Sequence, residues 1–143
     1  MEVIIPARIP HVWDEFGPEL ARALKRDASR DLMAVYRELL AGRLVAWRVN
    51  GGWVVTEFTL DEAGNRSLWV VYAAGVIATG LRGFVSGIMG EFERMARTGV
   101  FGPLRGRKCK QIRIWGRKGW QRLLPDYDPT PMADGRVEYR KVL

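Results

Sequence analysis

The chain has 143 residues, enough for one domain with a substantial core and too few for two ordinary domains. Its longest apolar stretch, Leu68–Ala74, is far too short to cross a bilayer, and no membrane association is expected. A single cysteine (Cys109) and a single histidine (His11) exclude an intrachain disulfide, a Cys/His zinc site and a serine-type triad. No metal site is therefore expected.

The net charge of +7 is concentrated in one segment. Arg94–Arg122 holds ten Lys and Arg residues and no Asp or Glu, which leaves the rest of the chain at −3. A local basic field attracts phosphates, nucleic acid or an acidic protein surface. Solvation of loop and helix surfaces explains the same residues equally well at this point.

The first third of the chain predicts a short edge strand at 3–5 and then two helices. The first begins at Pro10 and buries a stripe that recurs every four residues, with a kink expected at Gly17-Pro18. Asp27 or Ser29 is expected to cap the second, and Gly42 follows its end. The apolar faces of these helices are Val12, Phe16, Leu20 and Leu24, and then Leu32, Val35, Tyr36, Leu39 and Leu40.

Three strands are predicted next, with no helix between them. Arg43–Val49 and Trp53–Leu60 are separated by Asn-Gly-Gly, which predicts a hairpin because these residues accept positive φ. A second turn leads into Ser67–Ala74. Because this third strand is apolar from Leu68 onward, we expect it to be central and covered on both faces.

The last part of the chain predicts a helix at Leu81–Thr98 and a strand at Lys110–Trp115, which ends at Gly116. From Arg117 to Leu124 the apolar residues follow helical spacing, and this predicts a short amphipathic helix with Trp120 in the core. A polar segment, 126–135, precedes a final strand at Val137–Val142. Cys109 is expected to be buried and unreactive, and His11 to be an ordinary first-turn residue.

This order of elements resembles that of the general N-acetyltransferase (GNAT) superfamily over the whole chain. Ile9-Pro-His-Val-Trp13 and the segment Ile112–Leu123, with its Gly-Arg-x-Gly-Trp core at Gly116–Trp120, are similar to segments of short GNAT-like proteins of tailed phages and prophages. The resemblance implies a single α/β (α+β) domain over residues 1–143. Its central mixed sheet would contain an antiparallel meander, carry helices on both faces and splay into a V between two parallel strands.

The resemblance also implies a place for acetyl-CoA, at the start of the Leu81 helix, where backbone N–H groups favour an anion. Active members carry Gln/Arg-x-x-Gly-x-Gly/Ala there, and no register of 75–83 supplies this pattern. Gly80, Arg82 and Gly83 offer only a partial cradle. No cofactor is therefore expected, and acetyl-CoA is the cofactor if the chain is an enzyme after all.

Catalytic residues are not evident either. Family members often use a carboxylate on the central strands as base and a tyrosine in the last helix as acid. The only carboxylate inside these strands is Glu57, for which an outward surface position is the simpler interpretation, and Tyr127 lies beyond Pro125. No catalytic residue is assigned, and whether the chain is an enzyme stays open.

Two functions are carried forward. The first is a non-catalytic structural, assembly or binding component of a phage particle; the second is an N-acetyltransferase that acts on an amine. Partners of the first would be DNA or an acidic protein surface of the particle, and the chain itself could form homo-oligomers. The expected location is the host cytoplasm or the virion, since the N-terminus lacks the features of a secretory signal. The expected partner-binding residues are Arg105, Arg107, Lys108, Lys110, Arg117 and Lys118.

Overall fold

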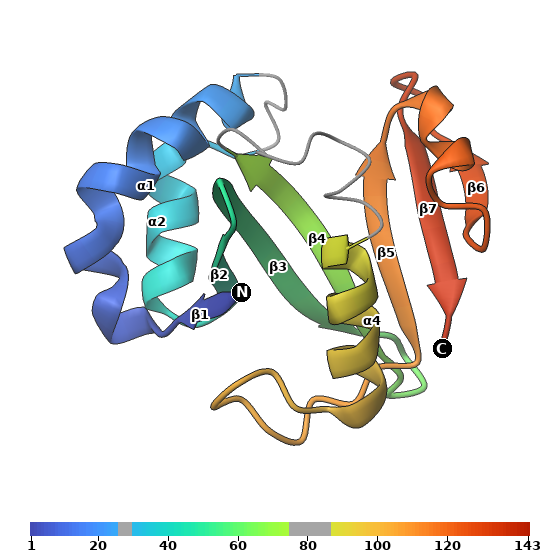
Figure 1. Ribbon diagram of the computed structural model, residues 1–143, viewed down its shortest axis with the longest axis horizontal. Coiled ribbons are helices and arrows are strands. Elements are labelled where there is room, and N and C mark those ends of the chain that lie inside the picture. Colours follow the sequence, from blue (N-terminus) through green and yellow to red (C-terminus); the bar gives the residue numbers. More distant parts are fainter. Residues whose placement is uncertain (26–29, 75–86) are drawn as a thin grey trace. The chain divides into compact units, whose positions relative to one another are not determined.

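The computed structural model describes residues 1–25, 30–74 and 87–143. Hydrogen bonds join seven strands into one mixed sheet in the order β1-β2-β3-β4-β5-β7-β6. The chain forms two compact parts: Met1–Glu57 with Val71–Ala78, and Phe58–Val70 with Thr79–Leu143. Strands β3 and β4 contribute residues to both parts (Figure 1).

The first part is an antiparallel meander packed against two helices. Leu44, Ala46, Trp53 and Val55 alternate along two strands and share one core with the buried stripes of the helices. Trp13 and Tyr36 join the helices, with ring centroids 4.5 Å apart. The elements of this part are β1 (Glu2–Ile4), the 3-10 turn η1 (Pro6–Arg8), α1 (Ile9–Leu24), α2 (Leu32–Leu40), β2 (Leu44–Val49) and most of β3 (Gly52–Leu60).

Both predicted helices of this part are present. Pro10 lies in the first turn of α1, and Gly42 follows α2 with a φ of 77°. The cap of α2 is Asp31, whose carboxylate accepts a hydrogen bond of 2.7 Å from the backbone N–H of Ala34. The two predicted caps, Asp27 and Ser29, lie outside the described residues. No described helix is long and apolar enough to span a membrane.

The second part is built on the parallel pair predicted from the sequence. Ser67–Val70 of β4 pair in parallel with Gln111–Ile114 of β5, and β7 runs antiparallel on the other side of β5. Phe92, Phe101 and Tyr139 are fully buried in this part. Its elements are the start of β4 (Arg66–Ala74), α4 (Met89–Thr98), β5 (Gln111–Gly116), the 3-10 turn η3 (Lys118–Arg122), β6 (Asp128–Pro131) and β7 (Val137–Val142).

Three expectations for these strands and turns are wrong. The predicted amphipathic helix Arg117–Leu124 is only the five-residue turn η3, because Gly116 and Pro125 leave no room for more than one or two helical turns. The polar segment 126–135 contains β6, an edge strand that tolerates two prolines. β4 is central, but only one of its faces is fully covered, since Trp69 and Val71 are half-buried and Ala73 is exposed.

Candidate functional site

The expected cofactor residues Gly80, Arg82 and Gly83 lie outside the described residues, as does the first part of the helix predicted from Leu81. The described part of that helix is α4, which ends at Thr98 and is followed by Gly99 with a φ of 78°. The placement of these residues therefore neither supports nor opposes binding of acetyl-CoA. The splay of β4 and β5 likewise stays a prediction.

Tyr127 is buried and hydrogen-bonded. It is 5% exposed, and its hydroxyl donates a hydrogen bond of 2.6 Å to Glu93 of α4. Burial raises the pKa of this phenol well above its usual range, and the hydrogen bond and charge of Glu93 raise it further. Lys141 of β7 also contacts Glu93, at 3.3 Å. Tyr127 therefore fixes the segment after η3 to α4, and as a proton donor it is weaker than an ordinary tyrosine.

Glu57, the one carboxylate inside the predicted central strands, is half-buried and bound by an arginine. Its Oε2 lies 3.2 Å from a guanidinium nitrogen of Arg30. A carboxylate in such an ion pair has a structural role, because a general base needs a lone pair directed at its substrate. By the register of β2 and β3, Glu57 lies opposite Leu44, on the face that also carries Trp53 and Val55, so it does not have the outward position expected from the sequence.

The basic loop, which we define as Arg105, Arg107, Lys108 and Lys110, has an ordered backbone and exposed side chains. Backbone hydrogen bonds tie Arg107 to Gly99 and Lys110 to Arg66. The Arg66 guanidinium also donates to the carbonyl oxygens of Gly106 and Lys108, at 3.2 and 3.3 Å. None of the four cationic side chains has an ion pair with any described residue. The loop thus holds four unpaired positive charges in a fixed position.

Arg117 and Lys118 do not join this loop. The basic loop precedes β5, and these two residues follow it, so the strand separates Lys110 from Arg117 by about 23 Å. The six expected partner-binding residues therefore lie at the two ends of β5, and their role in binding stays a prediction. Arg117, Lys118 and Arg122 form a second group, the basic turn, and they too are exposed and have no ion pair among the described residues.

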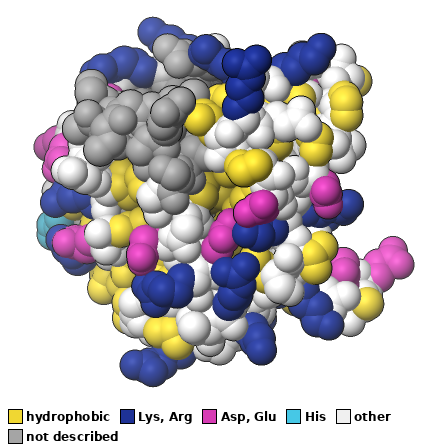
Figure 2. Space-filling model, turned by 45° about the vertical axis from the view of Figure 1, so that its right-hand side comes forward, with side chains coloured by type: hydrophobic (Ala, Val, Ile, Leu, Met, Phe, Trp, Pro, Cys, Tyr) yellow, Lys and Arg dark blue, Asp and Glu magenta, His cyan; other side chains and the backbone are white. Residues whose placement is uncertain are grey.

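The unpaired cations contrast with those elsewhere in the chain. Of the eight Lys and Arg residues in 105–122, only Arg113 forms an ion pair within the described structure. In contrast, basic residues such as Arg8, Arg43 and Arg94 each contact a nearby glutamate. On the face drawn in Figure 2, Lys and Arg side chains are spread widely, several with no Asp or Glu beside them. The side chains of the two basic groups therefore form no ion pair among the described residues.

The Gly-Arg-x-Gly-Trp motif has a packing explanation. The indole of Trp120 lies over Gly116, where a Cβ atom would come within 3.0 Å of three ring atoms. The same indole stacks on Tyr139, with centroids 6.5 Å apart. The Tyr139 hydroxyl donates a hydrogen bond of 2.6 Å to the carbonyl of Arg117. Trp120 is thus a half-buried cover over the end of β5, and its predicted place in the core is wrong.

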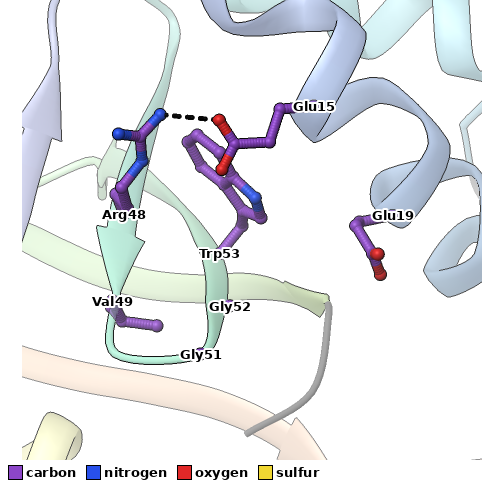
Figure 3. Close-up of a pocket in the computed structure, with 7 residues that line it drawn as sticks. All are labelled: Glu15, Glu19, Arg48, Val49, Gly51, Gly52 and Trp53. Carbon is purple, nitrogen blue, oxygen red and sulfur yellow. Dashed lines mark hydrogen bonds and ion pairs between the residues drawn. The ribbon is translucent and has the colours of Figure 1, made fainter.

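A pocket of about 360 Å³ lies in the first part, between α1 and the β2–β3 turn (Figure 3). The Arg48 guanidinium lies 4.8 Å from the centre of the Trp53 ring and 3.0 Å from Glu15. Glu19, the other carboxylate of the lining, pairs with Arg22. Because each charge already has a partner, we assign no ligand to this pocket. No group of three metal-binding side chains occurs in the described ranges.

Cys109 is buried, as predicted, directly before β5. Its backbone N–H donates to the carbonyl of Ala96, and its thiol contacts the carbonyl of Arg107. Burial raises the pKa of the Cys109 thiol to about 11. A thiol with this pKa is almost wholly protonated at neutral pH and is a poor nucleophile. His11 is an exposed residue of the first turn of α1.

No family model and no curated protein sequence matches the chain, but many solved structures do. A GNAT-family acetyltransferase from Listeria monocytogenes has a TM-score of 0.61, at 12% identity, over 99% of this chain and 94% of its own. Tetrahymena GCN5 has a TM-score of 0.58, at 9% identity, over 99% and 94% of the two chains. This chain has the GNAT fold.

A third match carries a CoA compound. Arabidopsis thaliana Naa50, in complex with a bisubstrate analogue of CoA, has a TM-score of 0.56 at 10% identity, with both chains fully covered. Identities this low define the fold alone, because the GNAT fold, like other common folds, can host unrelated sites. The activity of this chain must be argued from its own residues.

Proposed function

We propose that this GNAT-fold chain is a non-catalytic binding component and that its basic loop contacts an anionic partner, either nucleic acid or an acidic protein surface. The single observation that carries the proposal is the isolation of these charges. Four cations lie within six residues, on a backbone held by Arg66, and none of them forms an ion pair with a described residue. Like charges repel, so such a cluster is destabilising unless counter-ions or a partner neutralise it.

The contacts of the two candidate catalytic groups support the same proposal. The Tyr127 hydroxyl is hydrogen-bonded to Glu93, and the Glu57 carboxylate forms an ion pair with Arg30. Loss of the Glu57–Arg30 contact would leave a half-buried charge unpaired, which costs less than the several kcal/mol of a fully buried pair. Loss of the Tyr127–Glu93 contact would leave a buried hydroxyl without its hydrogen bond. A binding component needs no acid or base, whereas side-chain catalysis of acetyl transfer does.

We further propose that the chain comes from a tailed phage or prophage and acts in the virion or in the host cytoplasm, alone or as a homo-oligomer. This part of the proposal rests on the sequence resemblance of Ile9–Trp13 and Gly116–Trp120. The packing of Trp120 on Gly116 gives the second motif a structural reason to persist in such proteins.

N-acetyl transfer from acetyl-CoA to an amine is the second candidate function. The fold favours it, since the solved structures that match include acetyltransferases. It requires that a divergent segment around Gly80 and Gly83 binds the pyrophosphate and that the amine reacts with little help from side chains. This candidate predicts acetyl-CoA binding, which the first candidate does not require.

The proposal is tested by charge reversal in the basic loop. A variant with Arg105, Arg107 and Lys108 changed to Glu should lose association with heparin and duplex DNA, both used as polyanionic probes, and keep the parent melting temperature. The matched control reverses Arg8, Lys25 and Arg37, which changes the net charge equally but lies in the first part of the chain. If both variants lose binding equally, net charge alone explains it and the proposed loop is wrong.

A further inference from the structure

The second part of the chain has a sheet face that α4, its described α-helix, does not cover. Lys141 of β7 contacts Glu93 of α4, so the side chains of Val137, Tyr139 and Lys141 point toward α4. Neighbouring residues of a strand point to opposite faces. By the register of these strands, the face away from α4 carries the side chains that we call the tryptophan face: Trp69, Gln111, Arg113, Trp115, Glu138 and Arg140.

Aromatic and guanidinium groups alternate on the tryptophan face. Trp69 and Trp115 lie edge to face, with centroids 5.4 Å apart. Arg113 lies 4.7 Å above the ring of Trp69, and Arg136 lies 4.6 Å above the ring of Trp115. The indole N–H of Trp69 donates a hydrogen bond to the hydroxyl of Thr59 on β3. The face thus presents flat, rigid groups, of which both indoles and Arg113 are only partly buried.

Two buried donor atoms on this face lack hydrogen-bond partners. Nε of Arg113 and Nε1 of Trp115 are buried donors with no hydrogen bond in the described structure. Arg113 also lies directly opposite Arg140 in the ladder, a pairing of like charges that destabilises a sheet. Of these two arginines, Arg113 forms an ion pair with Glu138, at 3.6 Å. Asp128 lies opposite Arg140, but no ion pair joins them, and Arg140 is exposed.

The tryptophan face connects the two basic groups. The basic loop ends at Lys110, directly before β5, and the basic turn begins at Arg117, directly after it, so β5 carries the face from one to the other over about 23 Å. A compact anion would reach only one end. A polymer with regularly spaced charges and flat apolar groups between them would contact both ends and the face together.

We infer that the tryptophan face binds single-stranded nucleic acid, with bases stacked on its tryptophan and arginine planes and phosphates at the basic loop and basic turn. This inference rests on the proposed function and names its partner. Proteins that bind single strands combine a positively charged track with aromatic stacking platforms, at about 4–16 nucleotides per site. A duplex hides its bases, so it would engage the basic groups but not the face.

The experiment compares a labelled 12-nucleotide oligo(dT) with a 12-base-pair duplex by fluorescence anisotropy at fixed salt, using the full chain. The parent should bind the single strand at least tenfold more tightly than the duplex. Trp115→Ala should weaken single-strand binding at least tenfold and leave duplex binding unchanged. Trp115→Phe keeps a stacking surface and should recover most of the loss. Trp120→Phe, on the opposite face, is the matched control and should change neither affinity.

The outcomes separate the inference from the proposed function. Equal affinity for single strand and duplex, unchanged in Trp115→Ala, would overturn the inference, and so would no binding of either probe by the parent. If duplex binding is still lost on reversal of the basic loop, the proposed function survives that result. If Trp115→Ala does not fold, Arg140→Ala is the second variant. Arg140 is exposed, so its replacement should weaken single-strand binding without a change in melting temperature.

Discussion

Replacement of Gly116 by alanine tests the packing of the Gly-Arg-x-Gly-Trp motif. The new Cβ would lie 2.6 Å from Cδ2 and 2.7 Å from Cζ3 of Trp120, so the indole has to move away from the end of β5. Overpacking of this kind costs about 1–3 kcal/mol. Since Trp120 is only half-buried and can shift toward solvent, we expect about 1–2 kcal/mol, measured by urea denaturation.

A double-mutant cycle makes this prediction specific. In a Trp120→Ala background the clash is absent, and Gly116, whose φ is not positive, can accept alanine. Gly116→Ala should then be neutral or stabilising by about 0.5 kcal/mol, because alanine restricts the unfolded chain. A coupling of about 1–2 kcal/mol is expected between the two sites. Equal destabilisation in both backgrounds would refute the proposed contact.

The remaining predictions concern three other contacts. Tyr127→Phe should cost about 1.5–3 kcal/mol in urea denaturation, since it removes a hydrogen bond to the Glu93 carboxylate. The raised pKa of Tyr127 means that its stabilisation is complete below pH 10 and is lost as the pH rises further, so Tyr127→Phe should flatten the decline in stability measured above pH 10. Cys109 should resist iodoacetamide at pH 8 in the folded protein and react readily in urea, and rapid reaction of the folded form would contradict its burial. Asp31→Ala should cost about 1 kcal/mol through loss of the α2 cap, and a change within experimental error would show that another group caps the helix.

Local patterns were sufficient to predict most of the sheet. Alternation of Ile112 and Ile114 with polar residues, and the glycine after them, correctly predicted β5 and its end. The strand β6 could not be predicted in this way, because Pro129 and Pro131 are typical of loops and are tolerated only at a sheet edge. Edge position is a property of the assembled sheet, so no local signal reports it.

The candidate site was predictable only in part. The basic residues are evident in the sequence, and their division into two groups follows from the length of the strand between them, a signal that was available. The contact of Tyr127 with Glu93 joins residues 34 positions apart and has no local signature. The tryptophan face likewise depends on the register of β5 against β4 and β7, which places Trp69 beside Trp115.

Calorimetric titration with acetyl-CoA tests most directly whether this GNAT-fold chain is a binding component or an enzyme. The account predicts no binding in the micromolar range, since the segment 75–83 lacks the glycine-rich pattern of active members. Reversal of the basic loop should meanwhile abolish association with nucleic acid. Micromolar binding of acetyl-CoA that is lost when a bulky residue replaces Gly80 or Gly83, together with acetyl transfer to an amine, would contradict the account and establish the enzyme.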